Sequence, residues 1–139
     1  MADLSLRIGS ETLFVPPVVA ALKSYALRCG FVEEEATKIA VAVEEALANV
    51  IKHSYESRKE GVILIEADLK GDELCVRVSH QGKPFVLEGK RAAPDIEKLE
   101  KERKKGGFGL YQIEKFMDEF RLGHEKEWHY YLMKKHLRP

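Results

Sequence analysis

The sequence predicts an α+β fold: a two-layer sandwich in which helices cover one face of a largely antiparallel sheet. Pairs of short segments with alternating apolar and polar residues, separated by brief polar turns, indicate antiparallel hairpins. Other segments repeat apolar residues every three or four positions, which indicates helices packed on that sheet. The chain has 139 residues, the size of one domain, so residues 1–139 are expected to form a single domain with one core.

The N-terminal part is expected to form one strand and two helices. Alternation over residues 4–8 predicts a strand, and the Gly-Ser pair after it predicts a turn. A helix is expected over residues 16–29, because paired prolines suit its first turn and a glycine follows its last residue. A longer helix is expected from about residue 33 to residues 54–57, with acidic side chains in its first turn.

The C-terminal part is expected to form two strand pairs with a helix between them. Residues 62–69 and 73–79 predict a hairpin around a short polar loop that contains glycine. The later elements are an amphipathic helix over residues 111–120 and a closing strand pair at 120–122 and 128–133, around a turn at 123–126.

Periodicity weakens over residues 81–105, which contain Pro84, Pro94 and a dense run of charged side chains. A long irregular stretch in a compact domain is often a lid or a binding loop. We therefore expect a mobile lid at residues 84–105, although part of the charge run is also typical of a short solvated helix.

Charge and cysteine content narrow the classes of function. Lys and Arg (23) balance Asp and Glu (23), so no net field holds nucleic acid or an anionic membrane, and neither is expected as a partner. Cys29 and Cys75 lie far apart and in no metal-binding spacing, which predicts reduced core thiols. No stretch has the pattern of a signal peptide or a membrane span, so we expect a cytoplasmic protein.

A glycine-rich loop opens directly onto the last predicted helix. Glycines let the backbone approach an anion closely, and the free N–H groups and dipole of a following helix bind phosphate. The segment therefore indicates a phosphate site, although glycines before a helix also serve ordinary turns. Its sequence is Lys105-Gly106-Gly107-Phe108-Gly109-Leu110.

The long predicted helix carries a row of polar side chains. Glu45, Asn49 and His53 fall at i, i+4 and i+8 beside an apolar face, so an uninterrupted helix places them in one stripe. Asparagine is a poor helix-interior residue, because its amide competes for backbone hydrogen bonds. Asn49 therefore indicates a functional amide or, alternatively, a buried amide that bonds to neighbouring backbone.

The order of these motifs resembles the GHKL (Bergerat-fold) ATPase superfamily and, more narrowly, the anti-sigma-factor serine kinases. Residues 42–55, Ala-Val-Glu-Glu-Ala-Leu-Ala-Asn-Val-Ile-Lys-His-Ser-Tyr, resemble the N box of that family. Residues 78–85, Val-Ser-His-Gln-Gly-Lys-Pro-Phe, resemble its middle box. Residues 106–110, with Phe-Met-Asp-Glu at 116–119, resemble its last glycine box and trailing helix. The resemblance covers nearly the whole chain.

The resemblance implies a role for each matching residue. Asn49 would bind Mg²⁺ through its amide oxygen, and Glu45 would be the base that orients or deprotonates a substrate serine hydroxyl. His53 would line the phosphates or, alternatively, cap backbone near the helix end. Arg103 and Lys104 would add charge to the lid. The other nucleotide-binding positions would be Gly82, Phe85, Lys105, Gly106, Gly107, Phe108, Gly109 and Leu110.

His80 is a further implied nucleotide-binding position, and it departs from the family pattern. It stands where the family has an aspartate that accepts a hydrogen bond from the adenine amino group. Losing that charged hydrogen bond costs about 1.5–3 kcal/mol, or about ten- to a hundredfold in affinity. Three outcomes stay open: ATP binding with His80 as acceptor, a different base such as guanine, and a pocket kept only as architecture.

The resemblance thus implies an ATP- and Mg²⁺-dependent protein serine kinase. Its implied partners are a sigma factor, which it would bind, and an anti-sigma-factor antagonist protein, which it would phosphorylate. A homodimer is compatible with the resemblance. The alternative is a regulatory binding module that sequesters its partner without catalysis, and the histidine at position 80 motivates it.

Overall fold

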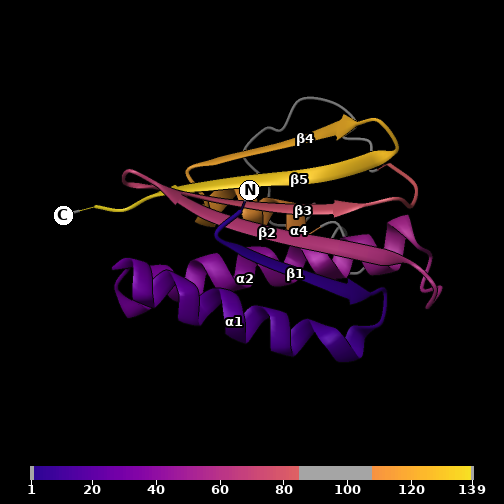
Figure 1. Cartoon of the computed structure of the whole chain (residues 1–139), viewed down its shortest axis with the longest axis horizontal. Helices are drawn as coiled ribbons and strands as arrows, with labels where there is room; N and C mark the ends of the chain where they lie inside the picture. Colours follow the sequence, from indigo (N-terminus) through magenta and orange to yellow (C-terminus); the bar gives the residue numbers. More distant parts are fainter. Residues whose placement is uncertain (1, 85–107, 139) are drawn as a thin grey trace.

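The computed structural model describes residues 2–84 and 108–138. Within them the strands form one five-stranded sheet in the order β1-β2-β3-β5-β4, and every neighbouring pair is antiparallel. Helices pack on one face of this sheet (Figure 1), which confirms the predicted α+β sandwich. The strands are β1 (Leu4–Gly9), β2 (Val62–Lys70), β3 (Glu73–His80), β4 (Glu119–Glu125) and β5 (Trp128–His136).

Helix α2 (Glu33–Asn49) is central to the helical layer, because it packs against both α1 (Val15–Cys29) and α4 (Phe108–Phe116). A short 3-10 turn, Thr12–Phe14, leads into α1. Gly30 ends α1 with a φ of 115°, a left-handed conformation that favours glycine. Both helices predicted for the N-terminal part are present.

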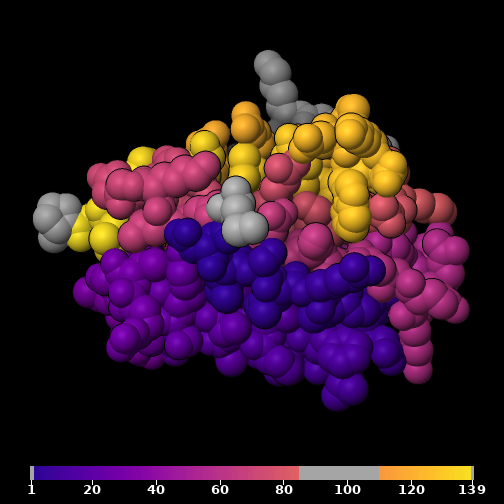
Figure 2. All heavy atoms as spheres, viewed as in Figure 1, coloured from indigo at the N-terminus to yellow at the C-terminus, as the bar shows by residue number. Residues whose placement is uncertain are grey.

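The core lies between the sheet and the helices. Alternate side chains along β2 and β3 are buried, and the apolar face of α2 covers them. In the space-filling view the N-terminal strand and α1 occupy one half of the molecule and the β4–β5 hairpin the other half (Figure 2). The largest fully buried side chains include Leu22, Ile39, Leu47, Ile63, Ile65, Leu74, Ile113, Tyr131 and Met133.

The last helix is shorter than its amphipathic pattern predicts. It ends at Phe116, and β4 already begins at Glu119, so the predicted helical stretch to residue 120 is too long. The buried ammonium group of Lys135 donates a hydrogen bond to the Phe116 carbonyl and forms an ion pair with Glu35 at 2.9 Å. A lysine from β5 therefore caps the end of α4, which the local pattern does not reveal.

The final turn also lies later than predicted. Gly123 pairs with Tyr130 inside the β4–β5 ladder, and the turn comes after β4, where Lys126 has a φ of 57°. A Cβ atom at Gly123 would lie 2.4 Å from the Tyr130 ring. This glycine therefore permits a close approach between strands and does not make the turn that its type suggests.

The long helix is not uniform at its end. After Asn49 the backbone widens into a π-helical turn, Val50–Ser54, in which the Tyr55 N–H donates to the Val50 carbonyl at 2.9 Å. Such single π turns often mark functional sites. The helix predicted to reach residues 54–57 is thus present, but it changes its winding where the polar row continues.

The described residues also bear on the expected location, redox state and lid. No helix in the described ranges is long and apolar enough to cross a membrane. Cys29 and Cys75 are free thiols, as predicted, although each is only partly buried. The predicted lid, residues 84–105, lies outside the described residues except for Pro84.

Candidate functional site

Helix α2 presents Glu45 and Asn49 one helical turn apart. Asn49 is only 5% exposed, and its amide nitrogen Nδ2 has no hydrogen-bond partner among the described residues. Among the described residues, therefore, no neighbouring backbone group accepts a hydrogen bond from this nitrogen, contrary to the alternative interpretation of Asn49. Leaving a buried polar group unpaired costs about 1–3 kcal/mol, so the site is completed most favourably by a ligand that pairs with the amide.

Glu45 is partly buried, and its environment raises the pKa of its carboxyl group. The main cause is burial, and the carboxylate of Glu44 beside it adds to the effect. A raised pKa makes the ionised carboxylate a better proton acceptor than a solvent-exposed one. Glu45 therefore has the electrostatic character of a general base.

His53 lies in the π-helical turn and not on the α-helical segment that carries Glu45 and Asn49. The predicted stripe assumed α-helical spacing as far as position 53. Because the π turn is wider, the spacing argument holds only for Glu45 and Asn49. The predicted contact of His53 with nucleotide phosphates stays a prediction.

The loop after β3 is clamped against the π-helical turn. The Lys83 N–H donates to the Ser54 carbonyl at 2.8 Å, and the Gln81 N–H donates to the Tyr55 hydroxyl at 2.8 Å. A Cβ atom at Gly82 would lie 2.5 Å from the Ser54 oxygen, so glycine is required there. Gly82 thus lets the end of β3 meet the end of the long helix.

His80 is buried inside this junction, with 1% of its surface exposed. Its Nδ1 accepts a hydrogen bond from the Gly82 N–H at 3.1 Å, so Nε2 carries the proton of the neutral ring. Nε2 lies 3.5 Å from the Ser54 Oγ. Burial and the neighbouring His129 lower the pKa of His80 to about 4. Accepting a hydrogen bond from adenine would therefore require His80 to give up the bond from Gly82.

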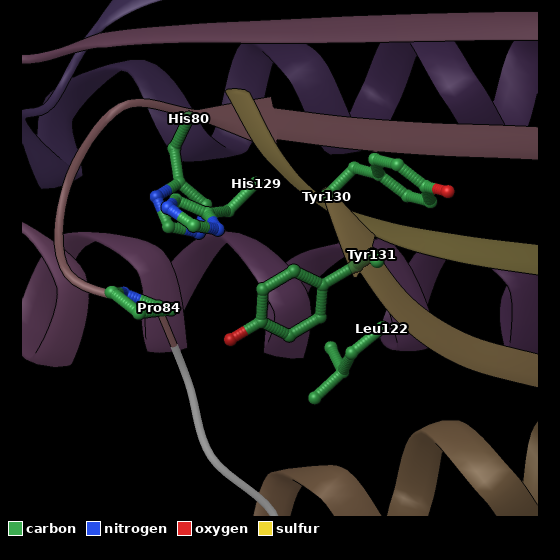
Figure 3. A pocket seen from close by; sticks show the side chains of 7 residues that line it. His80, Pro84, Leu122, His129, Tyr130 and Tyr131 are labelled. Carbon is green, nitrogen blue, oxygen red and sulfur yellow. The ribbon is translucent and has the colours of Figure 1, made fainter. Parts of the chain in front are cut away.

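A small pocket opens beside His80, between the loop at Pro84 and the β4–β5 hairpin (Figure 3). The imidazoles of His80 and His129 lie next to each other, with ring centroids 5.7 Å apart, and the Tyr131 hydroxyl points toward the same space. Tyr131 is 1% exposed, and its hydroxyl has no hydrogen-bond partner in the described part of the chain. The lining residues are His80, Pro84, Leu122, Gly123, His129, Tyr130 and Tyr131.

Sequence reasoning missed five residues of this pocket: Leu122, Gly123, His129, Tyr130 and Tyr131. The alternation of β5 places His129 and Tyr131 on the same face of that strand, which is the signal that was available. Their relation to His80 depends on the pairing of β5 with β3, where His129 stands directly opposite His80. Local periodicity does not determine which strands pair.

The glycine box reaches the described structure only at its end. Phe108 and Gly109 begin α4, and Leu110 is buried in the core. Because α4 packs against α2, the box leads into the layer that holds Asn49. Its contact with phosphate stays a prediction. Four predicted site residues lie outside the described residues: Phe85, Lys105, Gly106 and Gly107.

The donor set suits a magnesium ion bound together with a phosphate ligand. Among residues 2–84 and 108–138, no group of three or more His, Cys, Asp or Glu side chains is placed to hold a metal. Asn49 offers one hard amide oxygen. Magnesium in nucleotide sites takes few protein ligands and completes its shell with phosphate oxygens and water, so a single amide from the protein fits that ion.

Comparison with known proteins finds relatives over most of the chain. Residues 11–130 match the family model described as the histidine kinase-like ATPase domain. The serine-protein kinase RsbW of Listeria monocytogenes is 30% identical over 126 residues, which cover 88% of this chain and 80% of the relative. The serine-protein kinase RsbW of Bacillus subtilis is 27% identical over 126 residues, which cover 86% of this chain and 76% of the relative.

Solved structures share the same fold. The crystal structure of the RsbU and RsbW domains of Rv1364c from Mycobacterium tuberculosis matches 98% of this chain with a TM-score of 0.69 at 19% identity. This chain spans 32% of that longer chain. The histidine kinase domain of a blue-light activated histidine kinase from Erythrobacter litoralis matches 90% of this chain and 60% of its own, with a TM-score of 0.58 at 16% identity. At these identities the likeness concerns the fold alone.

Proposed function

Because the chain belongs to the histidine kinase-like ATPase domain family and is homologous to RsbW serine-protein kinases, we propose that it is a protein serine kinase that uses ATP and Mg²⁺. Its proposed protein partners are a sigma factor, which it binds, and an anti-sigma-factor antagonist, which it phosphorylates. The motifs for this role extend from the long helix to the glycine box and so involve most of the domain.

The unpaired amide of Asn49 is the observation that carries this proposal. Its side chain is buried, and Nδ2 lacks a partner among the described residues. In the proposed complex the Asn49 oxygen would hold Mg²⁺, and Nδ2 would be left to donate to a phosphate oxygen. The ion would supply positive charge that offsets the charge of the phosphates.

Glu45 is the proposed base. One helical turn before Asn49, its carboxylate accepts the proton of the substrate serine hydroxyl while the serine oxygen bonds to the γ-phosphorus and ADP leaves. The raised pKa of Glu45 supports this role, because the carboxylate then holds the transferred proton more readily. The rest of the catalysis consists of positioning and charge neutralisation.

A transfer assay with a matched pair of variants tests the proposal. The protein is incubated with labelled ATP, Mg²⁺ and the anti-sigma-factor antagonists of its source organism, and phosphoserine is measured. We expect Glu45→Ala to abolish transfer and Glu44→Ala, which removes the exposed neighbouring carboxylate, to retain it. Transfer that survives Glu45→Ala would remove Glu45 from its proposed role.

The burial of His80 favours a second candidate, a binding module without catalysis. Both nitrogens of its ring have partners inside the protein, so the position that recognises adenine in the resembling family is occupied internally. Calorimetric titration with ATP and Mg²⁺ separates the two candidates. Absence of both heat and thermal stabilisation at millimolar nucleotide favours the binding module, and saturable heat favours the kinase.

A further inference from the structure

Lys135 is a charged side chain at a core-facing position of β5. Alternate residues of this strand face the helices, and Tyr131 and Met133 at two such positions are fully buried. Lys135 is the next of them and is only 4% exposed. An apolar side chain is the usual occupant of such a position, and burying an ammonium group is costly unless its partners are well placed. A charge at this position therefore indicates that its contacts have a task.

The two partners of Lys135 belong to the two helices that lead to the candidate site. Its ammonium group lies 2.9 Å from the Glu35 Oε2, in the first turn of α2, and donates a hydrogen bond to the Phe116 carbonyl, in the last turn of α4. The hydrogen bond from Lys135 is the main cause that lowers the pKa of Glu35, so this carboxylate is charged at neutral pH. Lys135 thus joins the start of α2 to the end of α4.

The segment after α4 is fastened to β5 at the same place. The Asp118 N–H donates to the Lys134 carbonyl at 2.9 Å, and the Asp118 carboxylate accepts from the His136 N–H at 2.7 Å. The buried side chains of α4 itself, such as Leu110 and Ile113, are apolar, and apolar contacts are not directional. The polar contacts at its end therefore fix the position of α4 along α2.

These contacts set where α4 begins relative to Glu45. Helix α4 packs on α2 (Figure 1), and its last turn lies at the first turn of α2, so the two helices run antiparallel. The 9 residues of α4 span about 13 Å, and the rise along α2 from Glu35 to Glu45 is about 15 Å. The first turn of α4, which is the end of the glycine box, therefore lies level with Glu45.

We propose that Lys135 is a positioning residue for the nucleotide site: its contacts with Glu35 and Phe116 hold α4 where its first turn meets a phosphate bound at Asn49. Lys135 lies at the opposite end of α2 from Asn49, so it acts through α4 and not by contact with the nucleotide. A helix as short as α4 depends on tertiary contacts for its order. This inference rests on the proposed nucleotide-dependent function.

A double variant separates positioning from stability. Lys135→Met alone leaves the Glu35 carboxylate without its partner, which by itself lowers stability. Lys135→Met with Glu35→Gln removes both charges, so we expect a urea midpoint closer to that of the wild type, while the Phe116 carbonyl still lacks its donor. Lys134→Met is the matched control, because this neighbouring lysine lies on the opposite face of β5 and pairs with Glu73 at 3.6 Å.

Two measurements are made on the full chain, at a temperature at which circular dichroism shows the proteins folded. In hydrogen exchange without nucleotide, we expect the α4 amides of the double variant to exchange at least about fivefold faster than those of the wild type, and the β2 amides to change less. In calorimetric titration with ATP and Mg²⁺, we expect the Kd of the double variant to rise at least about fivefold, and that of Lys134→Met to change less.

Smaller changes in the double variant, in either the α4 exchange or the Kd for ATP, overturn the inference. It is also overturned if the β2 amides accelerate as much as those of α4, or if Lys134→Met loses as much affinity. A double variant that does not fold overturns it as well, because Lys135 is then needed for the fold and not for the position of α4.

The same proteins separate this inference from the kinase proposal. ATP binding that weakens in the double variant, without transfer to serine by the wild type, contradicts the kinase and supports the positioning role. Transfer to serine together with unchanged exchange in α4 contradicts the positioning role and leaves the kinase intact. Absence of ATP binding by the wild type contradicts both.

Discussion

Asn49→Leu is expected to stabilise the fold while it weakens nucleotide binding. Leucine has a similar branched shape, and it removes an amide nitrogen that is buried without a partner among the described residues. Relief of that unpaired group contributes about 1–3 kcal/mol, and the better helix propensity of leucine adds about 0.5 kcal/mol. We therefore expect the free energy of unfolding to rise by about 1.5–3.5 kcal/mol, equivalent to about 5–12 °C in Tm.

The assay is urea denaturation of the nucleotide-free protein, followed by circular dichroism, beside a calorimetric titration with ATP and Mg²⁺. Ala48→Leu, an exposed position next to Asn49, is the control and should change stability by less than about 0.5 kcal/mol. A destabilised Asn49→Leu variant would refute the reasoning, because it would mean that the amide is already paired in the folded protein. Stabilisation with full nucleotide affinity would refute the role of the amide in binding.

Three further perturbations test neighbouring parts of the structure. Gly82→Ala places a methyl group 2.5 Å from the Ser54 oxygen, and we expect a loss of about 1–3 kcal/mol in urea denaturation; an unchanged midpoint would contradict the close approach. Lys135→Met removes the partner of Glu35, and we expect a loss of about 1.5–3 kcal/mol at neutral pH. Lys135 lowers the pKa of Glu35 below its ordinary 4.5. The ion-pair part of the stability difference between wild type and Lys135→Met is therefore fully present above pH 4.5 and shrinks as pH falls through the lowered pKa. A stability difference that grows in acid would contradict this ion pair. Because burial raises the Glu45 pKa, kcat should fall with decreasing pH through a value above 4.5, and a rate that stays constant below 4.5 would exclude Glu45 as the base.

Local periodicity in the sequence is sufficient to predict most of the helices and strands of the fold. Alternation over residues 62–69 and 73–79 corresponds to β2 and β3, and the apolar stripe from residue 33 corresponds to α2. These elements follow from which side chains must face a core, and that pattern is local. The polar pair Glu45 and Asn49 follows from the same helical spacing.

Contacts between distant parts of the chain account for what local patterns missed. The π turn at Val50–Ser54 meets a loop that only Gly82 allows to approach. The end of α4 is capped by Lys135 from the last strand. The pocket at Tyr131 exists because β5 pairs with β3, an order that periodicity leaves undetermined.

The dependence of ATP affinity on Mg²⁺ tests most directly whether the Asn49 amide holds the magnesium ion of a bound nucleotide. Calorimetry is performed on the wild-type chain and on Asn49→Leu, each with Mg²⁺ and with EDTA. We expect the wild type to bind ATP at least about tenfold more tightly with Mg²⁺, a difference of about 1.4 kcal/mol, and Asn49→Leu to lose that difference. An equal Mg²⁺ effect in the two proteins would contradict the claim.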